Sequence, residues 1–308
     1  MKANHSDKVH RRLLSLCLVS LLAGVYLLTY RGFPVSIDEL SLFSTTESLV
    51  KYRELQIVSL YHEYPIITNL YTDTPWQGTL HEPLQIFLTA PFYWIAQHID
   101  GIGLLHTVWT FNVVVVMLIA LIIYRGGVAM GYSDAAAWIT AVMTAFGTML
   151  WHYSQTFFRE PLAGLLLLIT FVLAYQIQRN RAQLLLAWML LAFIGAVLTK
   201  AAALLTLPAL IFILLPDFSR RDQSRLWRVM LAIMILLILA FAVGGIIPND
   251  RFDIGHYVSR LGTSDTGYIR AVVGAYLFSP GRSIWATCPI LLLAFVGAWM
   301  AYRDGKRR

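Results

Sequence analysis

Apolar residues fall along this chain in long runs separated by short polar segments. The nine runs lie near residues 13–30, 84–97, 104–124, 135–151, 161–177, 183–199, 201–215, 227–247 and 284–302. A membrane-spanning helix needs about 20 consecutive, mostly apolar residues, and inside a bilayer its backbone must satisfy its own hydrogen bonds. The pattern therefore predicts an all-α polytopic membrane protein.

Lysine and arginine between the runs indicate how the chain crosses the membrane. Basic clusters occur at 8–12 (KVHRR), Arg125, 178–181 (QRNR), 219–228 (SRRDQSRLWR) and 303–308 (RDGKRR). Cytoplasmic loops carry an excess of these residues, so an even number of crossings should separate neighbouring clusters. Each later interval holds two runs, but the interval between the first cluster and Arg125 holds three.

The run at 84–97 is the one expected not to cross. It is short, contains Pro91, is rich in aromatic residues, and is flanked by polar residues such as His98. Runs of 10–14 residues are more often interfacial or re-entrant than spanning. We therefore expect a single domain, 1–308, with about eight transmembrane helices and both termini in the cytoplasm. An external segment, 31–103, would carry an interfacial helix at 82–98.

The composition agrees with a membrane protein, and the placement of the charges argues against a nucleic-acid-binding protein. The chain of 308 residues is 58% hydrophobic and 13% charged, whereas soluble domains are about 25% charged. Its net charge of +7 is accounted for by the topology clusters, whose partners would be lipid headgroups. We expect no nucleic-acid binding, because no surface of mixed basic and aromatic residues is visible. Cys17 and Cys288 lie in or near apolar runs, where a disulfide framework is not expected.

Polar chemistry is predicted to collect on the external side. Most histidines fall there, together with the long loop 248–283. Asp38 and Glu39 follow the first span in the sequence RGFPVSIDELSLF. One interpretation is a solvated helix start capped by Ser36. The other is a carboxylate that acts as general base or binds a hard cation.

Cations near the external ends of spans are the other candidates. Lys200 separates two apolar runs with almost no loop, and it either snorkels to the surface or meets a phosphate. Arg159 and Glu160 precede Pro161, which suits a first helical turn. The two could pair with each other, or Arg159, like Arg282, could bind phosphate in a bidentate manner. No Gly-rich phosphate loop, GxSxG, HExxH or CxxC motif is present.

Five segments in order resemble the C-type (GT-C) membrane glycosyltransferases. They are similar to the family 39-like branch of protein O-mannosyltransferases and lipid A aminoarabinose transferases. The matching segments are IDE (37–39), HEPLQIFLTAPFYWIAQHI (81–99), REPLAGLLLLITFVLAY (159–175), LTKAAALLTLPALIFIL (198–214) and YLFSPGRSIWATCPILLLAF (276–295). Together they cover most of the chain.

The resemblance implies that a sugar moves from a polyprenyl-phosphate donor to an acceptor outside a bacterial inner (plasma) membrane. Asp38, with Glu39, would then deprotonate the acceptor or help to bind a divalent cation. Lys200, with Arg159 and Arg282, would hold the donor phosphate. The interfacial helix would line the cavity, to which His81, Glu82 and Glu160 are also assigned.

Three departures from the family pattern keep alternatives open. Glu82 stands where the family usually carries proline or lysine, and an arginine common near the next span is missing from 104–115. The chain also ends soon after FSPGR, whereas relatives usually continue. A shortened, non-catalytic protein that binds lipid-linked substrates is therefore the alternative. A transporter is disfavoured, since charges are almost absent from the centres of the runs.

Overall fold

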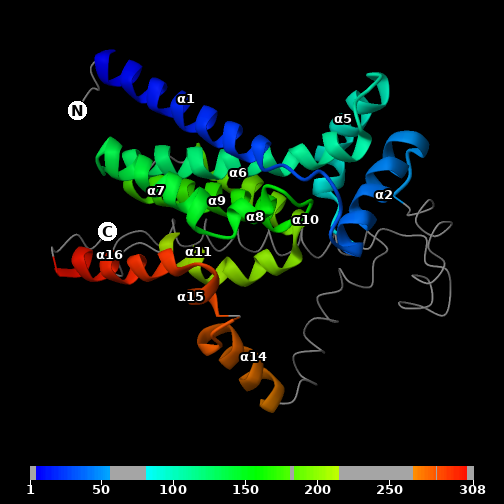
Figure 1. The fold of residues 1–308 in the computed structure, drawn as a ribbon. Helices are drawn as coiled ribbons and strands as arrows, with labels where there is room; N and C mark the ends of the chain where they lie inside the picture. Colours follow the sequence, from blue (N-terminus) through cyan, green and yellow to red (C-terminus); the bar gives the residue numbers. More distant parts are fainter. Residues whose placement is uncertain (1–4, 56–80, 181–183, 215–265, 282, 304–308) are drawn as a thin grey trace.

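The computed structural model describes residues 5–55, 81–180, 184–214, 266–281 and 283–303 (Figure 1). These residues form helices and their connections, without a β-strand among them. The helices are α1 (His5–Leu28), α2 (Ile37–Tyr52), α5 (Leu84–His98), α6 (Leu104–Ala129), α7 (Asp134–Gly147), α8 (Leu150–Tyr153), α9 (Glu160–Asn180), α10 (Leu185–Thr199), the 3-10 helix η1 (Ala201–Thr206), α11 (Leu207–Leu214), α14 (Thr266–Phe278), α15 (Ile284–Thr287), the 3-10 helix η3 (Pro289–Leu291) and α16 (Leu292–Arg303). The predicted all-α class is confirmed for this part of the chain.

Three of these helices are long and apolar enough to cross a membrane, namely Ser6–Leu28, Leu104–Ala129 and Glu160–Arg179. Shorter apolar helices occupy Leu185–Thr199, Ala201–Leu214 and Pro289–Met300. The helix predicted at 84–97 forms as α5, and its 15 residues fall short of the span length of about 20. The run at 227–247 lies outside the described residues.

Two predicted runs are each divided into shorter helices. The run at 135–151 is broken at Thr148, whose backbone is extended with φ −128° and ψ −179°. The run at 201–215 begins as η1 and becomes α-helical at Leu207. Pro208 has no N–H to donate to the preceding turn, which explains why one continuous α-helix does not run through this position.

The long helix α6 lies at the centre of the bundle and packs against α1, α5, α7 and α9. The helix α9 continues the packing to α10 and α11 through a second apolar cluster that includes Phe193 and Met189. Where α1 leads into α2, Gly32 has a φ of +63°, and a Cβ there would lie 2.5 Å from His106. Glycine is therefore favoured at this turn, because it adopts positive φ without strain and leaves the His106 ring in place.

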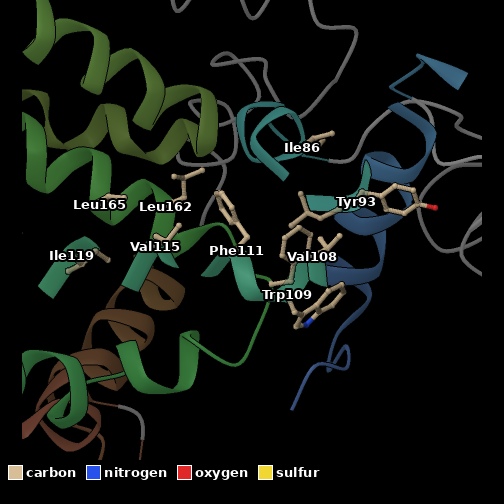
Figure 2. Close-up of a cluster of buried hydrophobic side chains, with 11 residues drawn as sticks. Ile86, Tyr93, Val108, Trp109, Phe111, Val115, Ile119, Leu162 and Leu165 are labelled. Atoms are coloured by element: carbon tan, nitrogen blue, oxygen red, sulfur yellow. The ribbon is translucent and has the colours of Figure 1, made fainter. Parts of the chain in front are cut away.

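A buried aromatic and aliphatic cluster joins α2, α5, α6 and α9 near one end of the bundle (Figure 2). Trp109 of α6 stacks on Phe157, which precedes α9, with ring centroids 4.8 Å apart. Tyr93 of α5 packs against Phe43 of α2. This cluster fixes the starts of α2, α5 and α9 relative to one another, and these three helix starts carry most of the predicted site residues.

Three of the predicted basic clusters meet at the opposite end of the bundle. Arg11 pairs with Asp134 at 3.1 Å, and Arg125 donates to the Ser15 hydroxyl at 3.3 Å. Arg179 donates to the backbone carbonyl of Met130 at 3.5 Å. Arg11, Arg125 and Arg179 therefore lie at the same end of the bundle.

Candidate functional site

The predicted carboxylates Asp38 and Glu39 lie in the first turn of α2. Ser36 is the N-cap, and its hydroxyl accepts from the Glu39 N–H at 3.3 Å. The Glu39 carboxylate in turn accepts from the Ser36 N–H at 3.1 Å and the Val35 N–H at 2.6 Å. This reciprocal arrangement is a capping box, so the predicted cap at Ser36 is confirmed.

Glu39 is fully buried and also joins α2 to a distant segment. Its second carboxylate oxygen accepts from the Phe157 N–H at 2.6 Å. A buried charge is tolerated where several donors satisfy it, and here three backbone N–H groups do so. The carboxylate of Glu39 thus anchors the segment before α9. Because it is buried, it does not face a sugar acceptor.

Asp38 points away from this buried network. Its side chain is 59% exposed, and one carboxylate oxygen lies 3.8 Å from Nε2 of His81. The His81 side chain is only 2% exposed. The contact is an ion pair when the imidazole is protonated. Of the two predicted carboxylates, Asp38 is the one that a substrate can reach.

Glu82, the residue after His81, is a buried carboxylate with two partners. One oxygen is ion-paired with Arg159, which immediately precedes α9. The other accepts from the Ala201 N–H at 2.9 Å, at the start of η1. Glu82 therefore ties the start of α5 to the starts of α9 and η1.

Glu160 and Lys200 form the second ion pair of this region. Lys200 stands between α10 and η1 with an extended backbone, φ −155° and ψ 112°, which turns its side chain toward α9. Both side chains are partly exposed. Arg159, just before α9, and Glu160, its first residue, each form their ion pair with another residue and not with each other. Arg159 pairs with Glu82, which precedes α5, and Glu160 pairs with Lys200, which lies between α10 and η1.

The two ion pairs are connected to each other in a closed circuit of contacts, here called the four-charge ring. Its members are Glu82, Arg159, Glu160 and Lys200. Arg159 and Glu160 are neighbours in sequence, as are Lys200 and Ala201, and the Ala201 N–H returns to Glu82. Two cations and two carboxylates give a formal net charge of zero. Because His81 precedes Glu82, Asp38 lies beside this ring.

Two buried amides hold the segment that carries Arg159. Asn112 of α6 donates to the carbonyls of Thr156 and Phe158, both at 2.8 Å. Gln85 of α5 donates to the carbonyl of Phe157 at 3.2 Å. Sequence reasoning did not identify either residue. The available signal was an amide within an apolar run: Asn112 is the single amide of the run at 104–124, and Gln85 lies near the start of the run at 84–97. A buried amide must find hydrogen-bond partners.

Tyr153 of α8 lies close enough to Glu160 to respond to its charge. Burial raises the pKa of the Tyr153 phenol, and the negative charge of Glu160 raises it further. The phenol therefore stays neutral well above neutral pH and remains able to donate a hydrogen bond. It adds a polar, uncharged group to the surroundings of the ring.

The structure brings together six of the eight predicted site residues in positions at or beside the ring: Asp38, His81, Glu82, Arg159, Glu160 and Lys200. Glu39 is fully buried and bonded to backbone N–H groups. Arg282 lies outside the described residues. For a divalent cation, Asp38 and His81 supply two donors, and no group of three or more His, Cys, Asp or Glu that could hold a metal occurs within the described ranges.

Comparison of the chain with protein-family models, with curated proteins and with solved structures yields no match.

Proposed function

We propose that this protein is a glycosyltransferase that moves a sugar from a polyprenyl-phosphate donor to an acceptor at the external membrane surface. The observation that carries the proposal is the position of an accessible carboxylate, Asp38, beside a cluster that holds two cations, Arg159 and Lys200. Lipid-linked sugar transfer needs a base for the acceptor and cations for the donor phosphate, close together at one end of an apolar bundle.

In the proposed reaction Asp38 takes the proton of the acceptor hydroxyl. The acceptor oxygen then forms a bond to the anomeric carbon of the sugar, and the bond from that carbon to the phosphate oxygen breaks. Polyprenyl phosphate leaves with the electron pair, and its added negative charge is stabilised by Arg159 and Lys200. His81 acts as a positioning residue, because its buried ring lies against the Asp38 carboxylate.

The four-charge ring imposes a condition on this reaction. Both cations already have carboxylate partners, Glu82 for Arg159 and Glu160 for Lys200. A donor phosphate must therefore exchange with a carboxylate or share its cation. The Lys200 pair is the more exposed of the two, so the phosphate would reach Lys200 first. Removal of a buried partner from Arg159 would be far more costly.

The same neutral ring supports a second candidate function. A non-catalytic protein that binds lipid-linked substrates would not need cations free to stabilise a leaving group. In that case the ring would serve mainly to join α5, α9 and η1. Both candidates share the proposed topology of about eight transmembrane helices, with the Asp38 end external and the basic end cytoplasmic.

A transfer assay with a charge-neutral substitution tests the proposal. Purified full-length protein would be given labelled polyprenyl-phosphate sugars and a panel of hydroxyl acceptors in detergent. Asp38→Asn should lower the turnover number by about a hundredfold or more, since general-base catalysis contributes about 10²–10⁴-fold. Asp100→Asn is the matched control, because Asp100 is an exposed carboxylate in the turn between α5 and α6.

The outcomes separate the two candidates. Transfer by the unmodified protein that falls with Asp38→Asn but not with Asp100→Asn supports the glycosyltransferase. Donor binding without transfer to any acceptor would support the non-catalytic alternative. Transfer that survives Asp38→Asn would refute Asp38 as the base.

A further inference from the structure

An apolar groove runs between α6, α7 and α9 at the basic end of the bundle, opposite the four-charge ring. Its main cavity is about 360 Å³ and is lined by residues that include Ile122, Gly126, Met130, Tyr132 and Val172. An adjoining cavity of about 230 Å³ shares Ile122, Gly126 and Val172. The main volume falls within the range of about 300–1,000 Å³ that is typical of small-molecule sites.

The groove exists because α6 carries two adjacent glycines where α7 and α9 approach it. A Cβ at Gly126 would lie 3.5 Å from a Val172 methyl, which is ordinary van der Waals contact. A Cβ at Gly127 would lie 3.0 Å from the Ala137 Cβ. Any longer side chain at Gly126 would therefore extend into the groove and occupy it.

The mouth of the groove is basic. Arg125 and Gln176 line the adjoining cavity, and Arg125 is exposed, with its guanidinium steadied by the Ser15 hydroxyl at 3.3 Å. The nearby carboxylate of Asp134 is already paired with Arg11 at 3.1 Å. A wall of apolar side chains that ends at an exposed arginine matches a ligand with a hydrocarbon chain and an anionic head.

We propose that this groove binds an anionic phospholipid, with one acyl chain along α6 between α7 and α9 and the headgroup phosphate on Arg125. Two observations select this occupant. The lining is almost wholly apolar, as an acyl chain requires, and the charge at the mouth is complementary to a phosphate. The convergence of Arg11, Arg125 and Arg179 at this end makes an anionic lipid the favoured headgroup.

This site differs from the proposed donor site in place and in chemistry. Arg125 lies at the opposite end of α6 from the helix starts that carry the four-charge ring. The proposal does not depend on sugar transfer. A protein without any transferase activity could still bind the lipid.

Native mass spectrometry of the full-length protein in neutral detergent tests the site. Phosphatidylglycerol is the anionic probe, and phosphatidylcholine is the zwitterionic comparison with the same acyl chains. We expect one phosphatidylglycerol to be retained in preference to phosphatidylcholine. Arg125→Gln should weaken phosphatidylglycerol binding about fivefold, the effect of about 1 kcal/mol per basic residue near an anionic surface. Gly126→Leu should weaken both lipids by filling the groove.

Matched controls distinguish the groove from general effects of charge and size. Arg31→Gln removes an exposed arginine at the other end of the bundle. Gly164→Leu adds the same side chain to α9 at a position where a Cβ meets nothing within 4 Å. Both controls should leave phosphatidylglycerol binding unchanged. If Gly126→Leu fails to fold, Ile122→Phe fills the same groove from a residue that lines both cavities.

Three results would overturn the proposal. Equal retention of the two lipids with no effect of Arg125→Gln would exclude a headgroup site at Arg125. Unchanged phosphatidylglycerol binding in a folded Gly126→Leu or Ile122→Phe variant would exclude the groove. Binding lost equally in Arg31→Gln would show that the lipid responds only to net charge.

Discussion

The ion pair between Glu82 and Arg159 is expected to be the strongest single electrostatic contact in the described part of the chain. The two side chains are only 9% and 16% exposed, and Glu82 also accepts from the Ala201 N–H at 2.9 Å. Glu82→Gln preserves the shape and an acceptor but removes the charge. Arg159 would then be left largely buried beside a neutral amide.

The expected loss of unfolding free energy in Glu82→Gln follows from the burial of the ion pair. Removal of one partner from a buried pair typically costs about 3–5 kcal/mol, because it leaves the other charge uncompensated. The retained amide and the neighbouring charge of Glu160 reduce this cost. We expect Glu82→Gln to lower the free energy of unfolding by about 2–3 kcal/mol. Arg159→Gln should have a similar effect, for the same reason.

A double-mutant cycle measures the pair itself. Unfolding of Glu82→Gln, Arg159→Gln and the double variant would be followed by denaturant titration in mixed micelles. The double variant leaves no unpaired charge. Its loss of unfolding free energy should therefore be smaller than the sum of the losses in the two single variants. We expect a coupling free energy of about 2 kcal/mol, within the range of about 0.5–3 kcal/mol for residues in contact.

The pair between Glu47 and Lys51 is the matched control. Their charged atoms are 2.5 Å apart within α2, but their side chains are 19% and 39% exposed. Solvent screens such a pair, and its coupling should be about 0.3–0.5 kcal/mol. Equal coupling for the two pairs, or additive losses at Glu82 and Arg159, would refute the argument that burial makes the Glu82 pair strong.

Two further predictions concern the supports of the site. Asn112→Leu should lower the free energy of unfolding by about 2–3 kcal/mol, because it leaves the two carbonyls held by Asn112 without their donor; a loss below about 0.5 kcal/mol in the same denaturant titration would contradict this. For Tyr93, burial first and the hydrogen bond to Glu47 second raise the pKa to about 12. The folded state therefore holds the phenol proton more tightly than the unfolded state. The contribution of the protonated Tyr93 to the free energy of unfolding is complete below about pH 10 and falls as pH rises through 12. Denaturation midpoints of the unmodified protein should decline over that interval more than those of Tyr93→Phe, and parallel curves would refute the assignment.

Local signals allowed part of the site to be predicted from the sequence. Ser36 and Glu39 have the spacing of a capping box, so the start of α2 at Ile37 follows from neighbouring residues alone. The apolar runs likewise predict helices, because burial in a bundle or bilayer demands them over such lengths. Pro91 and the shortness of its run predicted that α5 differs from the long helices.

The pairing of the charges could not be predicted in this way. Arg159 and Glu160 are adjacent, and only the approach of α5 and α10 to the start of α9 gives them Glu82 and Lys200 as partners. The same holds for Glu39, whose bond to the Phe157 N–H spans 118 residues. Its sequence position resembles that of Asp38, yet one carboxylate is buried and the other exposed.

The sequence by itself determined the helical class, the capped start of α2 and the concentration of charged residues at a few helix ends, because these depend on hydrophobic periodicity and local capping. The tertiary structure alone decided which charges neutralise each other and which carboxylate stays accessible. The physical reason is that ion pairing and burial depend on distances between helices. Those distances are set by the packing of the apolar cluster around Trp109 and Phe157 and are not encoded in any local pattern.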